Sequence, residues 1–185
     1  MIKQVFALLL PLALATTALA GEPENMPCQD TKIVLRLDLP WTKPERGNCW
    51  EWWADDYKSR TLFALWQGGL GKIVIRVSRL APKVRWRGQL KLDRRSLENW
   101  PGLKDLGISD IQKISCAVDK CVSFSAGEFK CGAFGYLTGS YGDIRHGDRE
   151  TEVVAGYYCS QSGEASEKLD GILEAIDLEP EFPKK

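Results

Sequence analysis

Two neighbouring stretches decide the fold class: residues 72–80, with the sequence KIVIRVSRL, and residues 83–92, with the sequence KVRWRGQLKL. In both stretches apolar side chains alternate with polar or charged ones. In the first, the odd-numbered residues from 73 to 77 are apolar, whereas Arg76 falls on the other side. A period of two is typical of a β-strand with one face on a core and the other toward water. The centre of the chain is therefore predicted to be a β-sheet.

Five further segments show strand-like patterns, and two of them are close enough to form a hairpin. Segments 110–117 and 121–125 lie on either side of a short loop, so we expect them to pair as its two arms. The other expected strands cover residues 32–39, 129–138 and 151–160.

A helix is expected at each end of this strand-rich region. Segment 49–67 has apolar residues at helical spacing, and Gly68 and Gly69 follow it as they follow many helices. The residues at that spacing are Trp50, Trp53, Ala54 and Tyr57. Near the C-terminus, one face of an amphipathic helix is traced by Leu169, Ile172, Leu173 and Ile176.

Together these segments predict an α+β fold. Its expected form is a mostly antiparallel sheet with an N-terminal helix, a C-terminal amphipathic helix and disulfide staples. Strands and helices do not alternate regularly along the chain, which argues against a doubly wound parallel sheet.

The first 20 residues have the layout of a secretory signal peptide. Lys3 precedes an apolar run from residue 5 to residue 15, and the small residues Ala18 and Ala20 stand before the expected cleavage site. The apolar run is shorter than the roughly 18 residues that a membrane span needs. We therefore expect residues 21–185 to form a single exported domain, periplasmic or secreted, without a transmembrane segment.

All six cysteines lie after the expected cleavage site, in the part that would reach an oxidising compartment. An even number of cysteines in an exported protein favours three disulfide bonds, although the number alone permits many pairings. The short separation favours Cys116–Cys121 as a local clip. The simplest remaining pairs are Cys28–Cys49 and Cys131–Cys159. Zinc is the less favoured interpretation, because the chain has one histidine and no CxxC spacing. No metal or cofactor is expected.

The charges are unevenly distributed although the formal net charge is zero. Between residues 72 and 95 nine cations face one anion, Asp93. Between residues 143 and 181 eleven Asp and Glu residues face three cations. A local excess of cations attracts anions within a Debye length, about 8 Å in physiological salt.

The basic stretch is the leading candidate for function. If Arg85, Arg87 and Lys91 share the solvent face of one strand, they form a row that arginine forks would make suitable for phosphates or carboxylates. The candidate binding residues of this surface are Arg76, Arg79, Arg85, Arg87, Lys91 and Trp52, the last as an exposed aromatic contact. The sequence thus predicts a non-catalytic binding protein for an anionic envelope component or an acidic protein partner, with no role for nucleic acid. The competing interpretation is an ordinary charged surface that faces the acidic C-terminal half.

The segment from Cys116 to Cys121 is the second candidate. A four-residue loop closed by a disulfide is rigid and loses little entropy on docking. The segment resembles the CxxxxC loop that periplasmic inhibitors of vertebrate-type lysozyme carry between strands. The resemblance covers these six residues and the following strand, and the histidine of that family's loop is missing here. It implies an inhibitor or immunity protein that inserts Asp119 and Lys120 into a hydrolase.

An envelope glycan hydrolase is the third hypothesis. Paired carboxylates are the minimum for that chemistry, and Asp55 and Asp56 stand beside three tryptophans. The single histidine, His146, has Asp143 and Asp148 nearby and could serve as a general base. Because no recognised catalytic motif surrounds these residues, binding is predicted in preference to catalysis.

Overall fold

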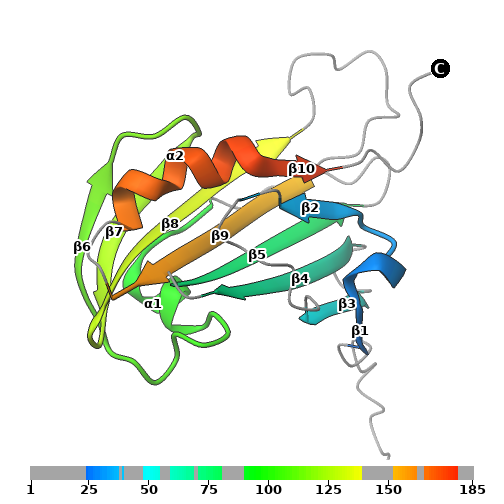
Figure 1. Cartoon of the computed structure of the whole chain (residues 1–185), viewed down its shortest axis with the longest axis horizontal. Helices are drawn as coiled ribbons and strands as arrows, with labels where there is room; N and C mark the ends of the chain where they lie inside the picture. Colours follow the sequence, from blue (N-terminus) through cyan, green and yellow to red (C-terminus); the bar gives the residue numbers. More distant parts are fainter. Residues whose placement is uncertain are drawn as a thin grey trace, which may run out of the picture.

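The computed structural model describes residues 24–37, 39, 48–54, 59–68, 71–80, 90–138, 152–161 and 165–178. In this part of the chain, eight strands form one antiparallel sheet (Figure 1). Their order across the sheet is β1 (Glu24–Pro27), β3 (Asn48–Ala54), β4 (Ser59–Gly68), β5 (Gly71–Leu80), β9 (Glu152–Ser160), β8 (Phe129–Thr138), β7 (Lys120–Ala126) and β6 (Ile108–Ile114).

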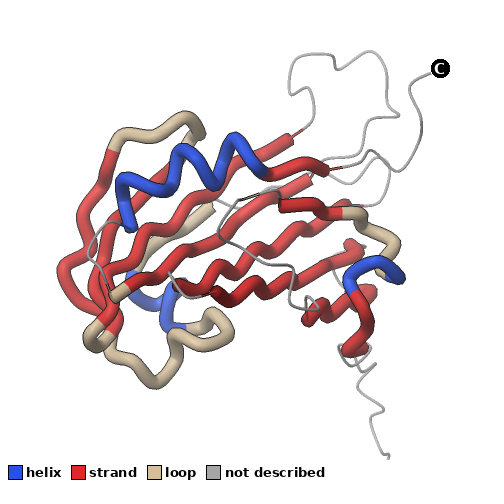
Figure 2. Tube along the Cα trace, in the orientation of Figure 1, coloured by secondary structure: helices blue, strands red, loops and turns tan. Residues whose placement is uncertain are grey.

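Short elements lie against this sheet. A second, two-stranded sheet pairs β2 (Leu35–Leu37) with β10 (Ile176–Leu178). The helical elements are η1 (Cys28–Asp30), α1 (Arg94–Glu98) and α2 (Ala165–Ala175). Figure 2 shows how far strands outweigh helices in the described residues. The architecture is therefore an α+β arrangement of a mostly antiparallel sheet with two short α-helices.

One side of the large sheet is covered by α2 together with β2 and β10, and we call it the α2 face. Leu169 and Ile172 of α2 are each 1% exposed and belong to one core cluster with Ile73 and Ile75 of β5. The helix can approach β8 closely because that strand has Gly132 at the contact. A Cβ atom there would lie 2.6 Å from Leu169 Cδ1. The structure thus has a short helix where a C-terminal amphipathic helix was expected, although Ile176, the last residue of the expected face, belongs to β10.

The opposite side carries α1 and the turn after it, and we call it the α1 face. Leu97, Trp100 and Leu103 pack there on a second core cluster with Val74 of β5 and Tyr157 of β9. Neighbouring residues of β5 therefore serve two different cores, Ile73 and Ile75 on the α2 face and Val74 on the α1 face. Both sides of the sheet centre are covered.

The three predicted disulfide bonds are present: Cys28–Cys49, Cys116–Cys121 and Cys131–Cys159. The first ties η1 to β3, and the second closes the loop before β7. The third joins β8 to β9 at positions that lie directly opposite each other in the register. Each bond joins segments that are already neighbours, so the disulfides reinforce contacts of the sheet.

The expected N-terminal helix over residues 49–67 is wrong, because the described residues of this segment, 49–54 and 59–67, belong to the antiparallel strands β3 and β4. Its side chains supply apolar groups to both covered faces, with Leu62 and Ala64 on the α2 face and Phe63 and Leu65 on the α1 face. A strand buried on both sides shows no clear alternation of hydrophobicity. The helical spacing of its apolar residues was therefore misleading.

The other expected strands agree with the structure more closely. The predictions for 72–80, 129–138 and 151–160 correspond to β5, β8 and β9, and the predicted hairpin corresponds to β6 and β7. The strand expected over 32–39 is reduced to β2. Of the strand expected over 83–92, Leu90 to Leu92 are not strand, and the remainder lies outside the described residues.

The signal peptide and the absence of a transmembrane segment were also expected from the sequence. The expected signal peptide, residues 1–20, lies outside the described residues. Within the described residues, neither helix combines the length and the apolar character that crossing a membrane requires.

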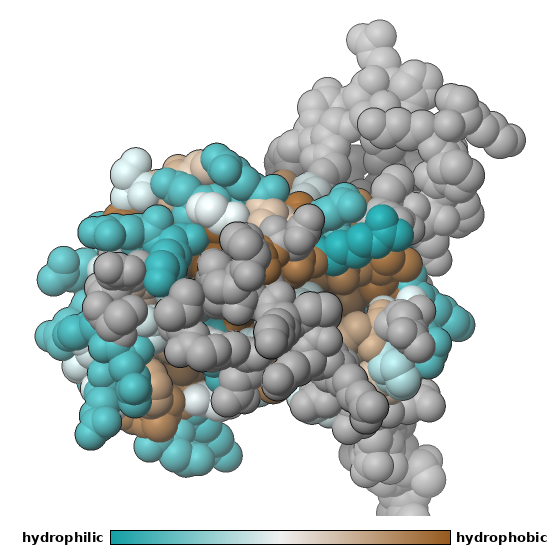
Figure 3. All heavy atoms as spheres, viewed as in Figure 1, coloured by the Kyte–Doolittle hydropathy of each residue, from teal (hydrophilic) through white to brown (hydrophobic). Residues whose placement is uncertain are grey.

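In the view of Figure 3, hydrophilic residues gather over α2, and hydrophobic residues come to the surface next to β2 and β10.

Candidate binding site

A row of aromatic and basic side chains crosses the α1 face from β3 to β5. In the register of the sheet, Trp50 lies opposite Phe63, and Phe63 lies opposite Arg76. One step along the strands, Trp52 lies opposite Thr61, and Thr61 opposite Ser78. Because residues that face each other on adjacent strands point to the same side, these side chains share one surface.

The rings of this surface are in contact with one another. Trp52 stacks on Phe63, with 5.3 Å between the ring centroids and 10° between the planes. Phe63 meets the indole of Trp100 edge-on at 5.9 Å, and Trp100 meets Tyr157 edge-on at 5.8 Å. Both arrangements are favourable for aromatic pairs, so the rings form a continuous apolar platform from β3 to β9.

The position of Trp100 is set by the short helix α1 and by an anchor on β9. Asp93 caps α1 by accepting a hydrogen bond from the backbone N–H of Ser96 at 2.9 Å, and this bond lowers the pKa of the Asp93 carboxyl. After the helix, the hydroxyl of Tyr157 donates to the carbonyl of Pro101 at 2.5 Å. Trp100 is thereby held over β5 from both sides, and it is 7% exposed.

Arg76 lies beneath this indole ring. Its Cζ is 5.3 Å from the centroid of Trp100, a distance at which a guanidinium is attracted by the face of an aromatic ring. Its Nε is the one buried side-chain nitrogen or oxygen without a hydrogen-bond partner among the described residues. Burial lowers the pKa of Arg76, and no carboxylate within the described part of the chain forms an ion pair with it. The guanidinium is therefore charged, largely buried and without an anionic partner among the described residues.

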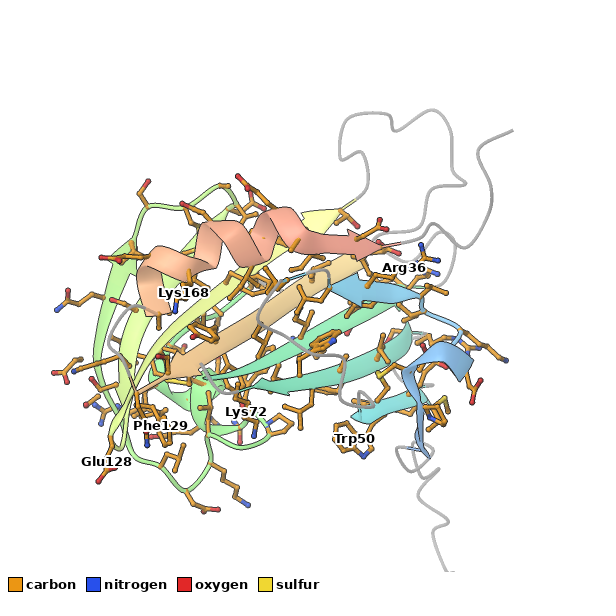
Figure 4. The ribbon with its side chains drawn as sticks, in the orientation of Figure 1. Arg36, Trp50, Lys72, Glu128, Phe129 and Lys168 are labelled. Carbon is orange, nitrogen blue, oxygen red and sulfur yellow. A yellow bond between two sulfur atoms is a disulfide. The ribbon has the colours of Figure 1, made fainter. Side chains whose placement is uncertain are left out.

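Polar groups of two kinds flank Arg76. On the Trp52 side, the hydroxyls of Thr61 and Ser78 are 3.1 Å apart and buried. On the other side, Lys72 projects from the same face of β5, and its Nζ packs so closely on Gly102 that a Cβ atom there would overlap it. Gly102 also has a φ of 79°, which favours glycine. In Figure 4 Trp50 and Lys72 lie in the lower half of the view, apart from Lys168 on α2.

The predicted basic surface is divided by the strand geometry. Arg79 is three residues after Arg76 and therefore points to the α2 face, where it is 4% exposed. There its Nε and Nη2 donate to Glu152 Oε1 at 2.6 and 2.5 Å. The same carboxylate accepts a hydrogen bond from Thr138. Arg76 and Arg79 thus have opposite environments: one has no anionic partner among the described residues, and the other is held by Glu152.

Of the remaining predicted residues outside the Cys116–Cys121 loop, Trp52 belongs to the platform, Lys91 is separate from it, and the others lie outside the described residues. Lys91 is exposed, three residues before the start of α1. Trp52 belongs to the platform, as described above, and is half-buried. The residues outside the described part of the chain are Arg85, Arg87, Asp55, Asp56 and His146.

The Cys116–Cys121 loop is tied to the body of the protein by its own polar groups. The backbone N–H of Ala117 donates to Asp170 Oδ1 of α2 at 3.2 Å, and Lys120 Nζ donates to the carbonyl of Leu90 at 2.7 Å. Asp119 is exposed. Of the two residues proposed to enter a hydrolase, only Asp119 is without such a contact among the described residues.

Six site residues were not anticipated from the sequence: Thr61, Phe63, Lys72, Ser78, Trp100 and Tyr157. The signal that could have found the first two is the alternation of Thr61, Phe63 and Leu65, which is recognisable only if this segment is interpreted as a strand. Trp100 comes from a separate element, and no spacing in the sequence links it to Arg76. No group of three or more His, Cys, Asp or Glu side chains within the described residues could hold a metal ion. Neither a protein-family model, nor a curated protein, nor a solved structure matches this chain.

Proposed function

We propose that this chain is an exported, non-catalytic binding protein that recognises an anionic ligand on its α1 face, through Arg76 and the aromatic platform around it. The observation that carries the proposal is the unpaired guanidinium. The signal-like N-terminal sequence and the three disulfide bonds support export.

A guanidinium in this state is unfavourable for the isolated protein. An enclosed N–H without an acceptor costs about 1–3 kcal/mol. The attraction to the Trp100 ring returns about 0.5–2 kcal/mol, so at the middle of both ranges it offsets only part of the cost. An anion placed at Arg76 would supply both the missing acceptor and the missing counter-charge. Arginine is well suited to this, because its planar fork forms two parallel hydrogen bonds with a carboxylate or phosphate.

The groups around Arg76 favour binding over catalysis. Within the described residues the polar groups nearest to Arg76 along β4 and β5 are the Lys72 ammonium and the hydroxyls of Thr61 and Ser78. None of them is a carboxylate or an imidazole, the side chains that most often serve as a general acid or base. They can, however, donate hydrogen bonds to an anion. The apolar rings next to them add contact area and lower the local dielectric, which strengthens those bonds.

Binding can be tested with immobilised ligands that differ in charge. The probes are acidic and neutral glycans, and vesicles of phosphatidylglycerol or of phosphatidylcholine. Wild-type protein from Gly21 onward, with its disulfides intact, is compared with Arg76→Met. Lys113→Met, which removes an exposed cation on β6, serves as the charge-matched control. We expect binding to one class of anionic probe that Arg76→Met loses and Lys113→Met retains. Equal binding by wild type and Arg76→Met would refute the proposal.

The loop hypothesis is separated by the same experiment. Asp119→Ala leaves the α1 face unchanged and should not affect binding to the anionic probes. If Asp119→Ala abolished binding while Arg76→Met did not, the functional surface would be the disulfide-closed loop, as the inhibitor hypothesis requires.

A further inference from the structure

We infer that the anionic ligand is an acidic sugar, a pyranose ring carrying a carboxylate, as in the uronic acid units of a polysaccharide. This inference rests on the function proposed above and specifies the ligand of the same site. It follows from the juxtaposition of three groups on the α1 face: the Trp52–Phe63 stack, the Arg76 guanidinium and the Thr61–Ser78 hydroxyl pair.

The aromatic stack provides a flat apolar surface beside the cation. Trp52 uses one ring face against Phe63 and is half-buried. Its described surroundings contain no further ring that would occupy the second face. A pyranose has one side dominated by C–H groups, and this side can pack on an indole with the dispersion and desolvation gains of any apolar contact. A lipid headgroup or a free phosphate has no comparable flat surface.

The spacing of the strands suits a single sugar unit. Trp52 is on β3, and Arg76 is two strands away on β5 and two residues along from the register partner of Trp52, so their backbones are separated by about 12 Å at 4.8 Å per strand and 3.3 Å per residue. Both side chains are long, and Arg76 extends beneath Trp100 within the platform. A pyranose ring with its carboxylate can therefore lie on one group and reach the other.

The charge of the site favours a carboxylate. The described residues place one arginine in this row, and one fork matches the two oxygens of one carboxylate. The other cation of β5 on this face, Lys72, is four residues away and packed on Gly102. Phosphate sites commonly combine several donors such as backbone nests or helix N-termini. The polar groups in the next register row, the hydroxyls of Thr61 and Ser78, are neutral and hydrogen-bonded to each other, so they add no charge that would favour a phosphate.

The test is a titration of tryptophan fluorescence with defined oligosaccharides. The acidic probes are oligomers of galacturonate, glucuronate and mannuronate, and the neutral probes are the corresponding oligomers in which each carboxylate is reduced to an alcohol. Phosphatidylglycerol vesicles and inorganic phosphate are the competing anions. The variants are Arg76→Met, Arg76→Lys and Trp52→Leu, with Lys113→Met as control. Calorimetric titration replaces fluorescence for the tryptophan variant, and thermal melting establishes that each variant is folded.

We expect at least one uronate oligomer to bind and its neutral counterpart to bind at least about tenfold more weakly. Arg76→Met and Trp52→Leu should each weaken uronate binding by about tenfold or more, and Arg76→Lys should fall between wild type and Arg76→Met because it keeps the charge but loses the fork. Lys113→Met should bind like wild type.

The failures of the two proposals are distinguishable. If phosphatidylglycerol vesicles or phosphate bind in an Arg76-dependent manner and no uronate does, the acidic-sugar inference is overturned while the anion-binding function stands. If neutral and acidic oligomers bind equally, or if no anionic probe depends on Arg76, both are overturned. A folded Trp52→Leu variant with unchanged uronate affinity would overturn the assignment of the aromatic stack.

Discussion

Two arginines on β5 should respond to the same substitution in opposite directions. Arg76→Met and Arg79→Met each remove one guanidinium from one strand and leave a flexible apolar side chain. The partners that remain differ. At position 76 no anionic partner is present among the described residues, whereas at position 79 Glu152 loses two hydrogen bonds.

For Arg76→Met we expect stabilisation. The substitution removes an enclosed N–H without an acceptor, which costs about 1–3 kcal/mol, and gives up a cation–π contact of about 0.5–2 kcal/mol. Methionine keeps the packing against Trp100 and adds a sulfur–aromatic contact of about 0.3–1.5 kcal/mol. The net gain is about 1 kcal/mol. For a domain of this size it corresponds to a rise in Tm of about 2–4 °C.

For Arg79→Met we expect a loss. Removing one partner of a buried ion pair typically costs about 3–5 kcal/mol, because the remaining charge is left without compensation. Glu152 keeps its bond from Thr138 and is 14% exposed, so the lower end of that range applies. The Tm should therefore fall by about 6–12 °C.

The assay is urea and thermal unfolding of the oxidised protein without ligand, followed by circular dichroism. Lys113→Met, an exposed site, sets the baseline for loss of one cation and should change the unfolding free energy by less than about 0.5 kcal/mol. A destabilisation of Arg76→Met by more than about 1 kcal/mol would refute the reasoning, because Arg76 would then be a stabilising residue and its unpaired state could not signal a ligand.

Three further predictions concern other parts of the fold. Burial, together with Glu152, raises the pKa of Tyr136 to about 12, and burial also raises the pKa of Tyr157. The stability that these neutral tyrosines confer is complete below about pH 10 and falls as the pH rises above it. Unfolding free energies measured between pH 9 and pH 11 should show a smaller decline in Tyr136→Phe than in wild type, and an identical decline would contradict the assignment. Gly132→Ala should lower the unfolding free energy by about 1–3 kcal/mol because its Cβ would meet Leu169. Gly171→Ala, on the exposed side of α2, should instead raise the unfolding free energy by about 0.5–1 kcal/mol. Equal effects of the two substitutions would argue against close packing of α2 on β8. Tyr157→Phe should loosen the turn that holds Trp100, with a red shift of tryptophan emission and a decrease of about 1–2 kcal/mol in the unfolding free energy. An unchanged emission spectrum would show that the hydrogen bond to Pro101 does not position the indole.

Most strands could be predicted from sequence, including β5 and β9, which have buried residues on both faces and are rich in β-branched side chains. The hairpin of β6 and β7 was located from its two arms and the short loop between them, and α2 was located from its helical period. The short separation of Cys116 and Cys121 favoured that disulfide, and the other two observed pairs were the simplest that remained. The segment 49–67 failed because its apolar residues contribute to cores on both sides of the sheet and also recur at helical spacing.

The candidate site could not be assembled from sequence for the same reason. Its members become neighbours only through the pairing of β3 with β4 and of β4 with β5, which places Trp52, Phe63 and Arg76 on adjacent strands. With 49–67 interpreted as a helix, this pairing is absent. The basic character of residues 72–95 was visible in the sequence, but which cation lacks a partner depends on Glu152, which is 73 residues from Arg79.

The contrast between Arg76 and Arg79 also explains why charge counting alone is a poor guide to function in this chain. Nine cations between residues 72 and 95 suggest a basic surface, yet Arg79 is neutralised within the fold. A protein selected only for stability would satisfy or replace a guanidinium in the position of Arg76, since an apolar side chain there is expected to be at least as stable. Its retention beneath Trp100, without an anionic partner in the described part of the chain, is best explained if the partner comes from outside. The functional information of this sequence therefore resides less in the number of its cations than in Arg76, whose Nε is the buried side-chain polar atom that the described residues leave without a partner.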